Sequence, residues 1–191
     1  MVNTATVIFT DGARSFSPAV YLYGNGGPVS IYAFLDEMDR QGVMGGQDYE
    51  CASFIAIVGA FLGPGSFMLG VVNGPKSDTT RDLGKVKTGH SVNGFYLVDR
   101  SAAPVDGVTP MTMRRFREAW WVKDGESDPE LVELSSGTVI AEEKKARESD
   151  YGSKVGEFYD RLYGEKNYND LGLRTSYEKQ LRKQIEKKIT L

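Results

Sequence analysis

Apolar and polar residues alternate with the period of a β-strand near the start of the chain, and then follow the period of an α-helix. Residues 5–9 and 17–23 predict two strands, and the turn signal Asp11-Gly12 between them predicts a hairpin. Pro28 suits the first turn of a helix that Gly42 would end. The buried stripe of this helix, spaced at i, i+3, i+4 and i+7, is Ile31, Phe34, Leu35 and Met38.

The middle of the chain predicts a second helix and further strands. Residues 48–62 predict a helix with Cys51 on its buried side, and the apolar run 66–72 predicts a central strand. Residues 73–88 are polar without an apolar period, so they predict a long loop. Residues 94–99 predict a strong short strand.

The segment 111–122 fits either a strand or a helix, and a strand is favoured because two tryptophans and a valine precede a turn signal at Asp124-Gly125. Residues 131–134 could pair with it. After about residue 140 the composition changes, because residues 141–191 hold 12 Lys or Arg and 10 Asp or Glu. This segment predicts two or three solvated helices.

These elements predict an α+β fold with a mainly antiparallel sheet, two packed helices and a charged helical C-terminal extension. The predicted domains are a globular α+β domain at 1–140 and an extension at 141–191 packed on it. A chain of 191 residues is long enough for one such hydrophobic core.

Composition narrows the class of protein. A net charge of −3 gives no surplus of cations for binding phosphate backbones, so nucleic acid is not an expected partner. The single cysteine and single histidine exclude an internal disulfide and most metal sites, and no cofactor is expected. The start of the chain lacks the pattern of a signal peptide, and the most apolar run, 54–63, is too short to span a membrane. A soluble cytoplasmic protein is therefore expected.

The glycine-rich loop 24–28 lies between a predicted strand and a predicted helix, where backbone N–H groups can hold an anion. The alternative is a tight turn that requires glycine. If the loop binds a ligand, the chain would be a small-molecule or nucleotide-binding domain, possibly a hydrolase. The candidate residues for that site are Arg14, Tyr23, Asn25, Gly26, Asn73, Lys76 and His90.

Other chemistry-bearing residues have ordinary alternatives. The run 70–77 nearly matches a phosphate-binding loop, but Pro75 replaces its required glycine, and Lys76 then becomes an exposed loop lysine. His90 is the one candidate imidazole base, yet no nucleophile motif accompanies it. Cys51 is interpreted as a buried packing residue. The acids Asp36, Glu37 and Asp39 are interpreted as a solvated helix face.

A basic and aromatic segment is the candidate surface for a protein partner, because Trp and Arg dominate interface hot spots. The basic last helix, with an apolar stripe at steps of four, could instead pack on its own domain, enter a partner groove or form a homodimer. The candidate partner-binding residues are Arg114, Arg115, Arg117, Trp120, Trp121, Lys183 and Lys187.

The segment Val-Tyr-Leu-Tyr-Gly-Asn-Gly-Gly-Pro at 20–28, continued through 32–38, resembles a segment of uncharacterised bacterial, phage and plasmid proteins. In those proteins the loop before the helix reads approximately His-Trp-Asn/Asp-Gly. Tyr23-Gly24 stands here where His-Trp would stand, so no role of that histidine is transferred. The resemblance covers about the first seventy residues and implies a mobile-element origin. It suggests a non-enzymatic protein that inhibits a host defence complex by protein–protein contact.

Overall fold

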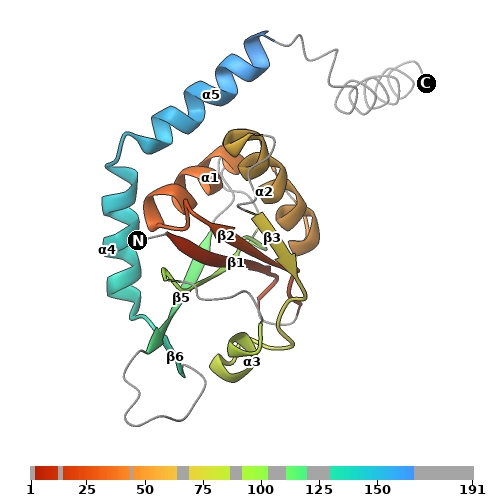
Figure 1. Ribbon diagram of the computed structural model, residues 1–191, viewed down its shortest axis with the longest axis vertical. Helices are drawn as coiled ribbons and strands as arrows, with labels where there is room; N and C mark the ends of the chain where they lie inside the picture. Colours follow the sequence, from red (N-terminus) through yellow and green to blue (C-terminus); the bar gives the residue numbers. More distant parts are fainter. Residues whose placement is uncertain are drawn as a thin grey trace, which may run out of the picture. The chain divides into compact units, whose positions relative to one another are not determined.

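The computed structural model describes residues 3–12, 15–43, 45–63, 69–86, 92–102, 111–119 and 130–165 (Figure 1). Within these residues the chain forms a six-stranded sheet and five helices, so the predicted α+β class is confirmed. The strands are β1 (Thr4–Thr10), β2 (Ala19–Tyr23), β3 (Leu69–Val72), β4 (Phe95–Asp99), β5 (Thr112–Ala119) and β6 (Glu130–Glu133). The helices are α1 (Pro28–Arg40), α2 (Gln47–Leu62), α3 (Thr80–Gly84), α4 (Ser136–Arg147) and α5 (Tyr151–Glu165).

The strands lie in the order β3-β2-β1-β4-β5-β6. The predicted N-terminal hairpin is confirmed, because β1 and β2 pair antiparallel with Val7 opposite Val20. The central pair β1–β4 is parallel, and the other neighbouring strands are antiparallel. From this centre the chain extends to β2 and β3 on one side and to β5 and β6 on the other.

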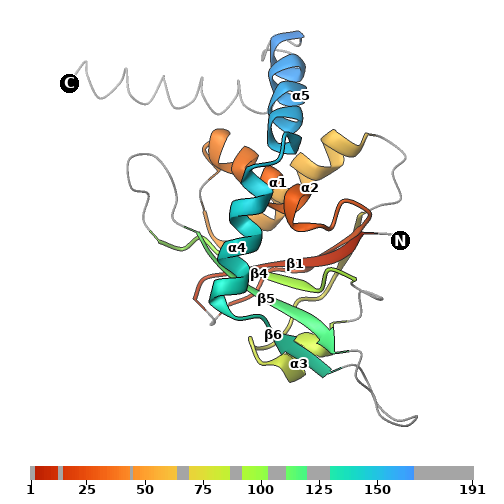
Figure 2. The same ribbon diagram turned by 90° about the vertical axis from the view of Figure 1, so that its left-hand side faces the viewer.

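One face of the sheet is covered by α1 and α2, as Figures 1 and 2 show. Pro28 opens α1 at its first turn, as the sequence predicts. The core on this face is aromatic. The Phe54 ring meets the rings of Phe9 and Phe34 edge to face, with centroids 5.6 and 6.3 Å apart. Such T-shaped pairs fix both helices against β1 and against each other.

The opposite face carries α3, which contradicts the predicted loop over 73–88. The Thr79 hydroxyl caps this helix by accepting a hydrogen bond from the N–H of Asp82. Leu83 is fully buried and anchors the single helical turn in the second core. That core consists of Ile8, Ala19, Leu83, Val86, Phe95, Leu97, Phe116 and Leu131. One apolar anchor is too few to leave a periodic signal in the sequence.

The remaining predicted strands are confirmed as strands, but the position of one of them in the sheet differs from the prediction. The segment 112–119 is a strand, and β6 pairs with it antiparallel. The apolar run at 66–72 predicts a central strand, but β3 is an edge strand of the sheet. Its apolar residues still pack on both faces, because Leu69 lies beside Gly59 of α2 and Val72 packs against the second core.

The helix α4 packs against α1 and β5. Ser135 caps it by accepting a hydrogen bond from the N–H of Thr138. The chain divides into two compact units, Met1–Val155 and Gly156–Leu191, and the boundary falls within α5. In the first unit, the Tyr151 ring packs on Phe34 and Phe61. Of the second unit the structure describes only the helical residues 156–165, so most of the predicted charged extension lies outside the described residues.

Candidate functional site

The three arginines of β5 point to different faces of the sheet, because side chains alternate along a strand. Arg114 lies on the face of α3, where it pairs with Asp78 and Glu133. Arg115 and Arg117 lie on the opposite face, under α4, and both contact Glu142 of that helix. The predicted basic segment therefore supplies two separate sites rather than one continuous surface.

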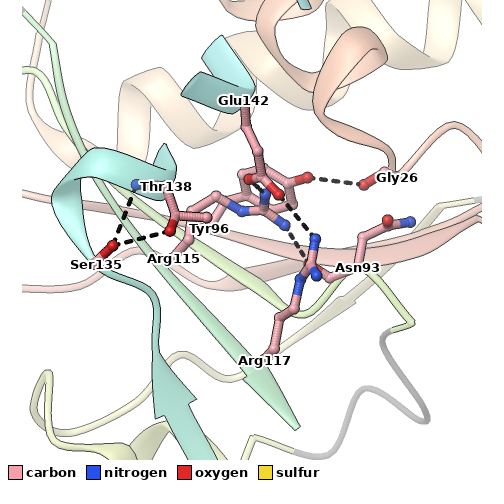
Figure 3. Close-up of polar contacts among 8 residues, drawn as sticks. All are labelled: Gly26, Asn93, Tyr96, Arg115, Arg117, Ser135, Thr138 and Glu142. Carbon is pink, nitrogen blue, oxygen red and sulfur yellow. Dashed lines mark hydrogen bonds and ion pairs between the residues drawn. The ribbon is translucent and has the colours of Figure 1, made fainter. Parts of the chain in front are cut away.

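Arg115 is the largest of the fully buried side chains that the structure describes, with 0% of its side chain exposed. Its guanidinium lies over the Tyr96 ring, 4.0 Å from the ring centroid. Its Nη2 donates to the carbonyl oxygen of Asn93 over 2.6 Å, and its Nη1 donates to a carboxylate oxygen of Glu142 (Figure 3). Burial lowers the pKa of Arg115, since the charged form loses hydration.

Glu142 joins the buried arginine to an exposed one. Its second carboxylate oxygen accepts a hydrogen bond of 2.8 Å from Arg117, whose side chain is 48% exposed. One carboxylate thus bridges two guanidinium groups, as Figure 3 shows. The arrangement neutralises the buried charge and fixes α4 over the end of the sheet.

The same cluster reaches the glycine-rich loop through Tyr96. The Tyr96 hydroxyl donates to the carbonyl oxygen of Gly26 over 3.2 Å. The Gly26 N–H donates to Asn3, and a Cβ atom at Gly26 would lie 2.5 Å from the backbone nitrogen of Ala5. Glycine is required here for close packing on β1, which favours the tight-turn interpretation of the loop.

A second aromatic–arginine pair lies on α1. Arg147 of α4 lies over the Tyr32 ring at 5.7 Å and pairs with Asp36 over 2.5 Å. The Tyr32 hydroxyl is buried and has no hydrogen-bond partner among the described residues. Burial, together with the nearby carboxylate of Glu143, raises the Tyr32 pKa to about 12. Two arginine–carboxylate pairs, Arg115 with Glu142 and Arg147 with Asp36, therefore hold α4 in place.

Chemically, this cluster holds structure together rather than performing acid–base work. Arg115 and Arg117 are already bonded to Glu142, and the two buried tyrosines have pKa values raised by burial. Groups with such pKa values do not exchange protons near neutral pH. Sequence reasoning could have found the shared face of Arg115 and Arg117 from strand alternation, but not their common partner on α4.

The predicted ligand residues that the structure describes fall into two separate groups. Tyr23 is the last residue of β2 and precedes Asn25 and Gly26, whereas Asn73 and Lys76 follow the end of β3. The register places Leu22 opposite Leu69 and Ala19 opposite Val72, so these two loops lie at opposite ends of the sheet. Arg14 and His90, like Trp120, Trp121, Lys183 and Lys187 of the partner set, lie outside the described residues.

The structure also shows whether other residues with predicted roles are buried or exposed. Cys51 is buried, as predicted. Lys76 is exposed. The predicted solvated face of α1 is wrong for Glu37, which is buried and bonded to Arg40 and Gln41. Carboxylates can be buried when hydrogen-bonded in this way, and the sequence pattern of α1 gives no sign of it.

A buried ion cluster lies where α1 ends and α2 begins. Arg100, which follows β4, donates to Asp39 over 2.5 Å and to the carbonyl oxygen of Val43 over 3.2 Å. Its Nε is 3.8 Å from Glu50 Oε1, too far for a hydrogen bond, and both buried atoms make none with the residues that the structure describes. Burial raises the pKa of the Glu50 carboxyl above its ordinary value, and Arg100 offsets only part of that rise.

Glu50→Gln is expected to change how stability depends on pH. Because the pKa of Glu50 is raised by folding, the native chain holds this proton more tightly than the unfolded chain. The resulting stabilisation is present below the unfolded pKa and is lost as the pH rises through the folded pKa. Urea unfolding should therefore show Glu50→Gln gaining stability relative to wild type as the pH rises above about 4.5, the ordinary pKa of a glutamate. A constant difference over this range would contradict the assignment.

The two edges of the sheet differ in how they are protected. The strand β6 has a glutamate at each end, and Glu133 is bonded to Arg114 over 2.6 and 2.8 Å. The strand β3, Leu-Gly-Val-Val, carries no charge and no proline, and its Val71 side chain is 53% exposed. Charged residues and proline are the usual protection of an edge strand. Among the described residues no strand lies beyond β3 (Figure 1).

Within the described ranges, no group of three or more His, Cys, Asp or Glu side chains could hold a metal ion. None of the helices described is both long enough and apolar enough to cross a membrane. Comparison with protein-family models, with curated proteins and with solved structures finds no match to this chain.

Proposed function

We propose that this chain is a protein-binding module that receives an extended segment of its partner along the edge of β3, where the described residues place no further strand. The observation that supports the proposal is the half-exposed Val71 on an uncharged edge strand. An edge strand offers a row of backbone donors and acceptors, and a partner strand gains affinity by completing the ladder. In this proposal the chain binds its partner and catalyses no reaction.

The side chains beside β3 indicate what the partner segment should contain. On one face, Val71 would contact an apolar, preferably β-branched, partner residue. On the other face Gly70 leaves space beside Tyr21, since a Cβ atom at Gly70 would lie 3.8 Å from the Tyr21 Cβ. A larger apolar partner residue opposite Gly70 would pack on that ring. The partner is therefore expected to present an alternating or continuous apolar strand.

This surface differs from the basic and aromatic surface that the sequence predicts. Arg115 has no exposed surface, and Arg114 and Arg117 are held in ion pairs on opposite faces of β5. For Trp120, Trp121 and the two lysines, which lie outside the described residues, a contact with a partner stays a prediction. The mobile-element origin and the host defence target also stay predictions, because they rest on the resemblance alone.

Val71→Lys is expected to abolish partner binding while leaving the fold intact. A lysine at this position would introduce charge into the ladder that the partner must join. A half-exposed position should change the free energy of unfolding by no more than about 0.5 kcal/mol. The measurement is affinity capture from a bacterial lysate with the tagged chain, followed by identification of stoichiometric partners.

Val132→Lys is the matched control, since Val132 is 49% exposed on the opposite edge strand β6. Wild type and Val132→Lys should capture the same partner, and Val71→Lys should not. Equal capture by all three proteins would exclude β3 as the contact. Failure of the wild type to capture any protein would contradict the proposed function itself.

A further inference from the structure

The parallel pair at the centre of the sheet creates a second feature, independent of the β3 edge. At the carboxyl end of β1 the chain turns towards β2, and at the carboxyl end of β4 it turns towards β5, on the other side. Thr10 and Asp99 lie opposite each other at these ends. Diverging connections leave a crevice outside the carboxyl ends of parallel strands, and ligands in open sheets bind at such points.

A hollow of about 130 Å³ lies at this place. It is lined by Thr10, Gly12, Leu97, Asp99, Thr112 and Arg114. Leu97 is nearly fully buried and contributes an apolar surface, while the other side chains contribute hydroxyl and charged groups. A cavity of about 150 Å³ can hold a benzene molecule, which has six non-hydrogen atoms, so the hollow has room for a ligand of roughly that size.

Asp99 is held with one oxygen available. Its Oδ1 accepts a hydrogen bond of 2.9 Å from the N–H of Ser101, which fixes the carboxylate. Its Oδ2 makes no hydrogen bond or ion pair with the part of the chain that the structure describes. A Cβ atom at Gly12 would lie 3.7 Å from Oδ2. Since Gly12 has φ +81°, a conformation that favours glycine, no side chain at position 12 covers this oxygen.

The charged side chains around the hollow favour a cationic ligand. Arg114, on the other side, donates to both oxygens of Glu133 and to Asp78. The hydrogen bonds that Arg114 donates to Glu133 and Asp78 raise its pKa, so the guanidinium stays paired with them. The carboxylates of Asp78, Glu133 and Asp99 therefore outnumber the single guanidinium of Arg114. A phosphate or carboxylate ligand would be repelled, whereas an ammonium group would be attracted.

We propose that this hollow is a binding site for a small aliphatic primary amine. The ammonium group contacts Asp99 Oδ2, and the alkyl chain lies on Leu97. A charge-assisted hydrogen bond to the partly enclosed carboxylate of Asp99 provides the affinity, and the apolar surface of Leu97 favours contact with a carbon chain over contact with water. The site is independent of the edge of β3, so either proposal can fail without the other.

The test is an NMR titration of the full chain with putrescine, observing the backbone amides of Gly12, Ser101 and Thr112. The uncharged isostere 1,4-butanediol and the anionic succinate are the ligand controls. Putrescine is expected to shift these amides saturably, with an apparent Kd that rises with salt. Butanediol should bind at least about tenfold more weakly, and succinate should not bind, since the charged hydrogen bond is lost.

Asp99→Asn is the decisive variant, because it keeps the shape of the side chain and removes its charge. It should weaken putrescine binding at least about tenfold. Asp150→Asn, at an exposed acid paired with Lys154 outside the hollow, should bind as wild type does. Equal binding of putrescine and butanediol, unchanged binding by Asp99→Asn, or the absence of any shift would overturn the proposal.

Discussion

Glu142→Ala is expected to lower the free energy of unfolding by about 3 kcal/mol. Among the described residues, the substitution leaves the buried Arg115 guanidinium with the Asn93 carbonyl and the Tyr96 ring as partners. Removing one member of a buried ion pair costs far more than the pair contributes, because the remaining charge has lost its hydration. For a chain of this size the melting temperature should fall by roughly 6–12 °C, which differential scanning calorimetry can measure.

Two further variants separate the buried pair from the exposed one. Arg117→Ala removes a contact of Glu142 with a half-exposed arginine, and should cost no more than about 1 kcal/mol. Combining Glu142→Ala with Arg115→Met should recover part of the loss, because the buried charge is then absent. If Glu142→Ala costs no more than Arg117→Ala, the buried pair does not hold α4 on the sheet.

Gly94→Ala is expected to destabilise the chain by at least about 3 kcal/mol or to prevent folding. Gly94 has φ +76°, and a Cβ atom there would lie 1.9 Å from the carbonyl oxygen of Phe116 in the neighbouring strand. An alanine must therefore both adopt an unfavourable backbone conformation and push β5 away from the start of β4. Soluble yield and urea unfolding measure the effect.

Gly152→Ala is the matched control for that substitution. Gly152 lies in the first turns of α5, and a Cβ atom there meets nothing within 4 Å. Alanine is favoured over glycine in a helix, so this variant should gain about 1 kcal/mol. Equal stability of the two variants would show that β4 and β5 do not approach each other as closely as the structure has them.

Local patterns in the sequence predicted the elements whose signals are local. Pro28 and the stripe from Ile31 predicted α1, and the Asp11-Gly12 turn predicted the β1–β2 hairpin. The short helix α3 could not be predicted in this way, because Leu83 is its one buried residue. The sequence also could not predict that Arg115 is buried, because arginine is almost never fully buried without a partner and the sequence does not identify that partner.

The candidate sites depended on contacts between distant parts of the chain. The hydrogen bond from Arg115 to Glu142 joins residues 27 positions apart, and β1 meets β4 across most of the first hundred residues. No periodic pattern encodes such pairings. The sequence drew attention to β5 and to the glycine-rich loop, but it did not indicate that β3 is an edge strand of the described sheet, which becomes visible only when the strand order is known.

The parallel pairing of β1 with β4 has a consequence for the chain as it is synthesised. One side of β1 can pair with β2 as soon as the hairpin has emerged, but its other side must wait for Phe95–Asp99. At roughly 5–20 residues per second, about 85 residues take between 4 and 17 s to be made. During that interval Val7, Ile8 and Phe9 belong to a strand with an open edge. The nascent chain is then most exposed to misassembly with its neighbours, and a chaperone that shields short apolar strands would act in this interval.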